Sequence, residues 1–221
     1  MVATGRPTAC FKAIDLWAAY LSPAWATPTH YKALREASRE HGVVVSSIAG
    51  GFGKSLELLE KYCQLAVEAE TTLLGIGGAL LPEQGEEIDK ILGRYGVKLA
   101  FENHPEEKTP ADVLAKIGDY PNIGSTLDTG WFATYDYPVV DAIEELKDRL
   151  LLVHLKNIKA PGGHEAAAWN NGYLDMEPIV RKLVQVGYTG YISLEYEPLD
   201  HDPRPICKEF REAVETWIAN S

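Results

Sequence analysis

Short apolar segments alternate with amphipathic segments along nearly the whole chain. The apolar segments predict buried strands at residues 10–16, 43–48, 72–76, 97–102, 122–127, 150–155 and 189–195, and the segment 43–48 is also mostly β-branched. Between them apolar residues recur at helical spacing, which predicts helices at about 29–42, 55–68, 86–95, 110–117, 138–147, 177–186 and 205–219. The pattern therefore predicts seven strands, each followed by a helix.

Local signals agree with the ends of several predicted helices. Gly42 and Gly96 stand where a helix C-terminus favours glycine. Ser55 is placed to cap the second helix, and Thr109 precedes Pro110, a proline suited to a first helical turn.

Strict alternation of strands and helices predicts a parallel sheet, because parallel strands need crossover connections of this length. Polar residues follow or end four strands, at Glu102, Asp128, His154 and Glu195. They meet at one centre only if the sheet closes, so we expect an α/β protein with a TIM-barrel-like parallel (β/α) barrel, in one domain over residues 1–221. Eight units are standard and seven are visible. We expect the first unit to be missing or incomplete. Three explanations are open: the barrel is open on one side, a partner supplies the unit, or the unit was lost.

The four polar residues form a candidate metal site. Asp128 follows Glu102 by 26 residues and His154 follows Asp128 by another 26, which matches one strand-to-strand repeat. Three carboxylates and one imidazole suit Mn²⁺ best, then Mg²⁺, while Co²⁺ and Zn²⁺ are also compatible. Each residue has a structural alternative, since an Asp can cap a turn and a His can belong to the core. Their equivalent places in successive units favour the metal site.

The residues two positions after Glu102, His154 and Glu195 are expected to point into the same open end of the barrel: they are His104, Lys156 and Glu197. His104 is a candidate general base or a group that orients a sugar hydroxyl. Lys156 either stabilises a developing oxyanion or neutralises the carboxylates. Asn103 faces the other way and is expected to be packed or hydrogen-bonded. Three tryptophans on this side are candidates for stacking on a sugar or for loop packing: Trp17, Trp131 and Trp169.

Composition narrows the class of partner. The chain is 46% hydrophobic and 24% charged, which is ordinary for a globular protein, and its formal charge of -11 disfavours nucleic acid. No apolar run approaches the roughly 18 residues of a membrane span, and residues 1–9 lack a signal-peptide core, so we expect a cytoplasmic protein. The spacing of Cys10, Cys63 and Cys207 predicts reduced core residues, with neither disulfides nor a zinc knot.

Four motifs resemble the xylose isomerase-like TIM-barrel superfamily of sugar phosphate isomerases and epimerases: FENH (101–104), LDTGW (127–131), VHLKN (153–157) and SLEYE (193–197). The resemblance implies a divalent metal bound by Glu102, Asp128, His154 and Glu195. It also implies that Glu102 and Glu195 exchange protons with a small sugar through an enediolate. A DNA-repair endonuclease of the same superfamily is opposed by the acidic charge and the scarcity of histidines.

Two departures from the epimerase motifs leave the reaction open. Trp131 stands where epimerases commonly have a histidine, and Asn157 stands where they have an aspartate. The DTGW form resembles a subgroup containing C-glycoside deglycosidases, in which His104 would be the base. The leading expectation is a metal-dependent sugar isomerase or epimerase, with Lys156, His104, Trp131 and Trp17 at the substrate. The alternatives are a metal-dependent lyase, either deglycosidase-like or keto-inositol dehydratase-like, and a non-catalytic truncated barrel. We expect a homo-oligomer.

Overall fold

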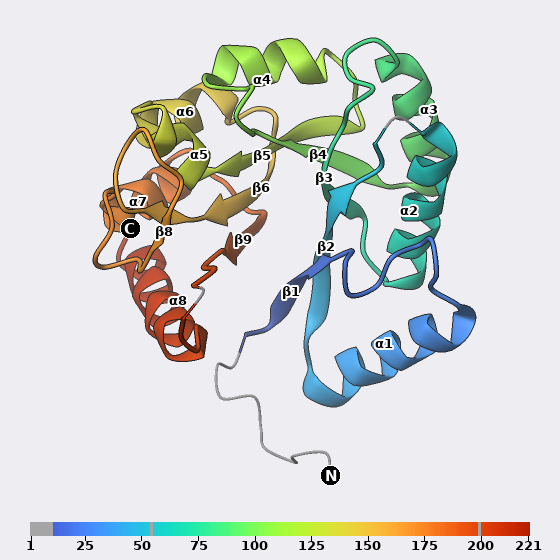
Figure 1. Ribbon diagram of the computed structural model, residues 1–221, viewed down its shortest axis with the longest axis horizontal. Coiled ribbons are helices and arrows are strands. Elements are labelled where there is room, and N and C mark those ends of the chain that lie inside the picture. The colour runs from blue at the N-terminus through green and yellow to red at the C-terminus, as the bar shows by residue number, and fades with distance from the viewer. Residues whose placement is uncertain (1–10, 54, 199) are drawn as a thin grey trace.

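The computed structural model describes residues 11–53, 55–198 and 200–221 (Figure 1). Seven parallel strands form one sheet and are hydrogen-bonded in the order β1 (Ala13–Trp17), β2 (Val44–Gly51), β3 (Leu73–Gly77), β4 (Lys98–Glu102), β5 (Ile123–Asp128), β6 (Leu150–Leu155) and β9 (Tyr191–Leu194). The principal helices lie outside the sheet: α1 (Pro28–His41), α2 (Leu56–Glu68), α3 (Gly85–Tyr95), α4 (Pro110–Ile117), α6 (Val139–Leu146), α7 (Met176–Gln185) and α8 (Arg204–Ala219). The predicted alternation of strands and helices is confirmed.

The sheet curls into a nearly closed barrel. In a flat sheet β1 and β6 would lie about 24 Å apart, because neighbouring strands are about 4.8 Å apart. The side chains of Asp15 in β1 and His154 in β6 nevertheless meet at 2.8 Å across the interior. The outer strands of the sheet order, β1 and β9, are not hydrogen-bonded to each other. The predicted TIM-barrel-like fold is confirmed, with one open seam between these two strands in the described part of the chain.

The predicted capping residues act as expected. Gly42 and Gly96 both end their helices with φ of 64°, a left-handed conformation that glycine adopts without strain. The Ser55 hydroxyl accepts a hydrogen bond from the Leu58 amide at 3.1 Å. Thr109 forms a reciprocal capping box at the start of α4. These local signals fix where each helix leaves the barrel wall.

Some features differ from the predicted elements. Helix α5 (Thr129–Thr134) follows β5 directly, and the loop after β6 contains the small hairpin β7 (Asn157–Ile158) and β8 (Ala166–Ala167). These elements are too short for periodicity to identify them. The first strand begins at residue 13, and the predicted core residue Cys10 lies outside the described residues. Cys63 is buried and Cys207 is half-buried, and both are free thiols.

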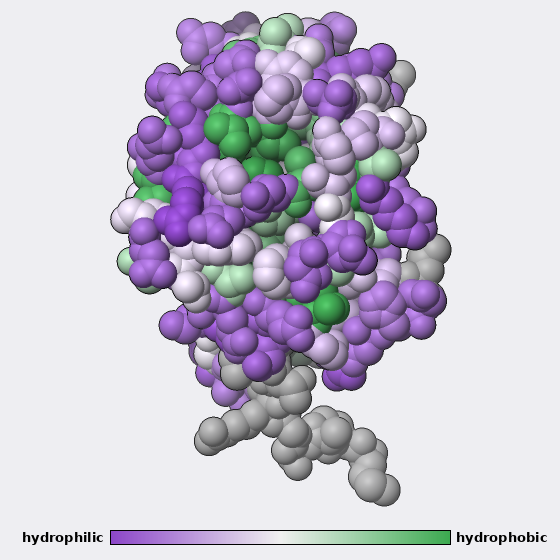
Figure 2. All heavy atoms as spheres, turned by 90° about the vertical axis from the view of Figure 1, so that its left-hand side faces the viewer, coloured by the Kyte–Doolittle hydropathy of each residue, from purple (hydrophilic) through white to green (hydrophobic). Residues whose placement is uncertain are grey.

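The core fills the space between the sheet and its helices, and every residue of β5 is buried. The outer face on the left of Figure 1 is mainly hydrophilic, with hydrophobic residues visible in a hollow near its middle (Figure 2). Among the described helices, none has the combination of length and apolar character needed to cross a membrane.

Candidate active site and metal centre

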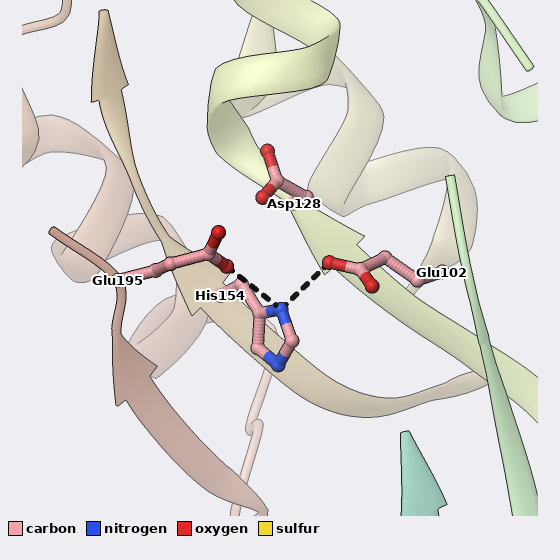
Figure 3. Close-up of side chains that lie close together, drawn as sticks. All are labelled: Glu102, Asp128, His154 and Glu195. Atoms are coloured by element: carbon pink, nitrogen blue, oxygen red, sulfur yellow. Dashed lines mark hydrogen bonds and ion pairs between the residues drawn. The ribbon is translucent and has the colours of Figure 1, made fainter. Parts of the chain in front are cut away.

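Four side chains converge at the carboxyl ends of the strands (Figure 3). Glu102 ends β4, Asp128 ends β5, His154 lies in β6 and Glu195 follows β9. One potential ligand atom from each lies within 4.8 Å of the others. The structure therefore brings together all four residues of the predicted metal site.

Strand register explains the convergence. Asp128 is paired with His154 across β5 and β6. On one side Glu102 is paired with Thr126, two residues before Asp128. On the other side His154 is paired with Ser193, two residues before Glu195. Because alternate residues of a strand share a face, these offsets of two place all four side chains on the inner face of the sheet.

Buried polar side chains hold the strand ends together. The Asn103 amide donates to the Asp128 carbonyl at 3.2 Å and accepts from the Asp128 amide at 2.8 Å. The Thr129 hydroxyl donates to the Lys156 carbonyl at 2.7 Å and accepts from the Lys156 amide at 2.9 Å. Asn103 and Thr129 are both fully buried. Asn103 is hydrogen-bonded as predicted, and these contacts fix β4, β5 and β6 relative to one another.

His154 lies between carboxylates on both edges of its ring. Its Nδ1 is 2.7 Å from Glu102 Oε1 and 3.2 Å from Glu195 Oε2, and its Nε2 is 2.8 Å from Asp15 Oδ2. Burial alone would lower the pKa of His154, but the charge of Glu102 and the hydrogen bonds to the carboxylates raise it well above the ordinary value. The Nδ1 edge faces the other three members of the cluster.

Asp128 has one oxygen engaged and one oxygen without a partner. Its Oδ1 accepts from the Trp131 amide at 2.7 Å, whereas its Oδ2 is buried without a hydrogen-bond partner among the described residues. Burial, followed by the charges of Glu195 and Glu102, raises the pKa of Asp128 well above the usual range. A buried carboxylate oxygen left unpaired is costly, and a cation would relieve that cost. Oxygens on opposite sides of an octahedral Mg²⁺ lie about 4.2 Å apart, so the spacing of the cluster fits a divalent ion.

Lys156 bridges the two glutamates that follow β9. Its Nζ donates to Glu195 Oε1 at 2.6 Å and to Glu197 Oε2 at 3.1 Å. Burial would lower the pKa of Lys156, but the charge of Glu195 outweighs burial and raises it. Burial would likewise raise the pKa of Glu195, but the hydrogen bond to His154 and the charges of His154 and Lys156 lower it to about 2. Lys156 therefore neutralises part of the carboxylate cluster in this arrangement.

The cluster opens into a cavity of about 820 Å³, which His104 also lines. The His104 Nδ1 lies 3.0 Å from the Glu102 carbonyl oxygen, which can only accept, so Nδ1 carries the proton. The other ring nitrogen, Nε2, lies 3.9 Å from Glu102 Oε2. The side chain of His104 is 42% exposed and points to the side on which Glu102 lies, as the strand parity predicts.

Aromatic rings flank the cavity. Trp17 and Trp131 both line it, and Trp131 stacks on His164 with ring centroids 3.5 Å apart. Trp169 does not line this cavity, because it stacks against Phe210 in α8 instead.

Sequence reasoning missed two cavity residues. Asp15 could have been found as a single charge inside an apolar strand. His164 comes from the loop after β6, where no periodic signal marks it.

A family model described as "Xylose isomerase-like TIM barrel" matches residues 10–219. An inosose dehydratase from Lactiplantibacillus plantarum is 25% identical over an alignment 195 residues long, and the alignment takes in 68% of this chain. The chain spans only 65% of the length of that relative.

Solved structures share the fold at low identity. A D-tagatose 3-epimerase-like protein is matched with a TM-score of 0.79 and 20% identity, over 95% of this chain and 90% of that one. A xylose isomerase-like TIM barrel protein from Mycobacterium smegmatis, in complex with magnesium, is matched with a TM-score of 0.76 and 20% identity, over 96% and 85% of the two chains.

Proposed function

The chain belongs to the xylose isomerase-like TIM barrel family, and from this premise we propose that it is a divalent-metal-dependent isomerase or epimerase of an uncharged sugar. The observation that carries the proposal is the cluster of three carboxylates and one imidazole with a buried, unpartnered oxygen on Asp128. Such a cluster is costly to fold without a cation, so a purely structural role explains it poorly.

The proposed metal ligands are Glu102, Asp128, His154 and Glu195. Mn²⁺ is the first choice because carboxylates with one imidazole suit it, and Mg²⁺ is the next, as found in the relative from Mycobacterium smegmatis. When bound, the ion would polarise a substrate carbonyl and so acidify the neighbouring C–H bond.

Glu102 and Glu195 are the proposed proton carriers. They extend from strands on opposite sides of β5 and β6, and both contact His154 Nδ1, at 2.7 and 3.2 Å. A sugar carbon held between them would meet one carboxylate on each face, so that one could remove a proton and the other return it. Against the effect of burial, the hydrogen bond to His154 and the charges of His154 and Lys156 hold the pKa of Glu195 below its ordinary value, so this carboxylate is ionised at neutral pH.

The charge of the cavity favours an uncharged substrate. Four carboxylates line it, those of Asp15, Glu102, Glu195 and Glu197, and Asp128 lies beside them. Its lining includes a single lysine or arginine among the described residues, Lys156, which two glutamates already engage. Even with a divalent cation present the site retains net negative charge, which would repel a phosphate or a carboxylate. A neutral polyhydroxy ketone fits better, with aromatic faces available for its ring.

A dehydratase is the second candidate. His104 lines the cavity beside Glu102 and donates from Nδ1 to the Glu102 carbonyl, so Nε2 is the ring nitrogen available to remove a proton during elimination. The relative from Lactiplantibacillus plantarum is named an inosose dehydratase, and inososes are also uncharged ketones.

Incubation of the Mn²⁺-loaded protein in D₂O with neutral ketoses and a keto-inositol tests these proposals. An isomerase or epimerase would incorporate deuterium into recovered sugar, and Glu102→Gln would abolish incorporation. A dehydratase would release a product one water lighter, and His104→Asn would slow that release. If the protein binds Mn²⁺ yet neither exchanges deuterium nor loses water with any substrate of the panel, both catalytic proposals are wrong.

A further inference from the structure

Asp15 is a buried carboxylate that meets the metal cluster from the opposite side of the barrel. It lies in β1, at the open seam, and its side chain is only 8% exposed. Its Oδ2 is 2.8 Å from His154 Nε2, the ring nitrogen that faces away from Glu102 and Glu195. We propose that Asp15 positions His154 as a metal ligand by accepting a hydrogen bond from its Nε2–H, which leaves Nδ1 as the nitrogen that binds the ion.

The chemistry of imidazole makes this contact directional. A neutral imidazole has one protonated nitrogen and one lone pair, and only the lone pair can bind a metal. A carboxylate oxygen accepts from a ring N–H, so the 2.8 Å contact with Asp15 Oδ2 assigns a proton to Nε2. Nδ1 lies 2.7 Å from Glu102 Oε1 on the side of the cluster, and it is the nitrogen whose proton a bound ion would replace. A carboxylate that orients a ligating histidine in this way typically strengthens metal binding.

His154 accounts for the whole hydrogen bonding of the Asp15 carboxylate within the described residues. The other oxygen, Oδ1, is buried and has no partner. The two residues are 139 positions apart, so no local turn or cap explains why a charge is buried here. A buried carboxyl group without partners is destabilising, and among the described residues the contact with the His154 ring is the interaction that offsets this cost.

A simpler alternative is that Asp15 ties the edge strand β1 to β6 without affecting metal binding. The two roles differ in what they change. A tether affects the stability of the metal-free fold, whereas a positioning residue affects the affinity for the metal and the protonated nitrogen of His154.

A calorimetric titration of the whole chain with Mn²⁺ alone separates these roles. We expect Asp15→Ala to bind Mn²⁺ about 10 to 100 times more weakly than the wild type. Asp15→Asn keeps the side-chain volume but replaces the carboxylate by a neutral amide, which can turn either its oxygen or its NH₂ group toward His154. We therefore expect Mn²⁺ affinity to fall by about threefold to tenfold. Glu197→Gln is the control, because it removes a cavity carboxylate that contacts Lys156 and not His154; its exposed side chain predicts a change of about twofold or less.

A second readout follows the ring directly. In the wild type loaded with diamagnetic Mg²⁺, nitrogen NMR of labelled histidine should find the His154 proton on Nε2, and in Asp15→Ala this proton should exchange much faster with water. Wild-type Mn²⁺ affinity in Asp15→Ala, or in Asp15→Asn if the alanine variant does not fold, would overturn the proposal. Because the inference rests on the proposed function, wild-type protein that binds no Mn²⁺ would overturn both, whereas normal wild-type binding with unaffected variants would overturn this inference alone.

Discussion

The barrel has a braced half, formed by β4, β5 and β6, and an open half, formed by β1 and β9 at the seam, and the candidate metal site takes residues from both. In the braced half all six residues of β5 are buried, and Asp128 is 0% exposed. In the open half no residue of β9 is fully buried, and the Glu195 side chain is 26% exposed. Buried hydrogen bonds from Asn103 and Thr129 fix the ends of β4, β5 and β6, whereas ion pairs with Lys156 and His154 hold Glu195.

The two halves perturb their carboxylates in opposite directions. Burial raises the pKa of Asp128 well above its usual range, because the fold excludes water there before any cation compensates. The cationic groups around Glu195 outweigh its burial and lower its pKa to about 2. Burial thus disfavours the charged form of Asp128, whereas neighbouring cationic groups stabilise the charged form of Glu195. A bound divalent ion would therefore stabilise Asp128 most, and the other three residues would complete its coordination.

Removal of a ligand from the braced half should have the largest effect. We expect His154→Ala or Glu102→Gln to lower Mn²⁺ affinity by more than about 100-fold, because each removes one of four proposed direct ligands. Metal content per purified chain, expected to be about one ion in the wild type, is the measurement. His104→Ala is the control, since its ring lines the cavity outside the cluster. Equal metal loss in His104→Ala would show that the cavity as a whole, and not this cluster, binds the ion.

The bracing itself can be broken at Asn103. Asn103→Ala leaves the buried amide and carbonyl of Asp128 without their partners, and we expect it to lower the free energy of unfolding by about 2 kcal/mol. Urea denaturation monitored by circular dichroism measures the change. Ser193→Ala at the corresponding level of β9 should cost less than about 0.5 kcal/mol, because that strand is only half-buried. Equal costs at the two positions would contradict the division into two halves.

Much of this architecture could be predicted from sequence because its signals are local. Continuous apolar runs specify strands, helical periodicity specifies helices, and the places of Glu102, Asp128, His154 and Glu195 at the ends of strands predicted that they meet at one centre. The two interpretations of Asp128 turn out to be compatible, since one oxygen caps α5 and the other is free to bind a ligand.

Contacts made by closure of the barrel could not be predicted in the same way. Asp15 looks like a single charge in an edge strand until β1 and β6 are brought together across 139 residues. His164 lies in a loop without periodicity, and its place against Trp131 depends on how that loop folds over the cavity. Chain closure is a tertiary property, so the open half was the less predictable one.

Substitution of Lys156 tests whether its ion pairs with Glu195 and Glu197 stabilise the open half. Lys156→Met leaves Glu195 and Glu197 without their shared cation, and we expect the metal-free protein to lose about 1 kcal/mol of stability, reduced by the exposure of both glutamates. Saturating Mn²⁺ should recover most of this loss, since it supplies positive charge to Glu195. Thermal unfolding with chelator and with Mn²⁺ measures both effects. A variant destabilised equally in both conditions would indicate a packing role for the lysine stem.

The smallest effect on the fold is expected at Trp17, on the exposed edge of the open half. Its side chain lines the cavity but is 57% exposed, so Trp17→Ala should change the free energy of unfolding by less than about 0.5 kcal/mol. If its ring stacks on the sugar, KM for the active ketose should rise about threefold to tenfold while kcat changes little, because stacking stabilises ground state and transition state alike. Trp25→Ala is the matched control, since Trp25 is 49% exposed but packs against His30 away from the cavity. An unchanged KM in Trp17→Ala would show that Trp17 does not stack on the sugar and would leave Trp131, fixed beside Asp128, as the aromatic face to test next.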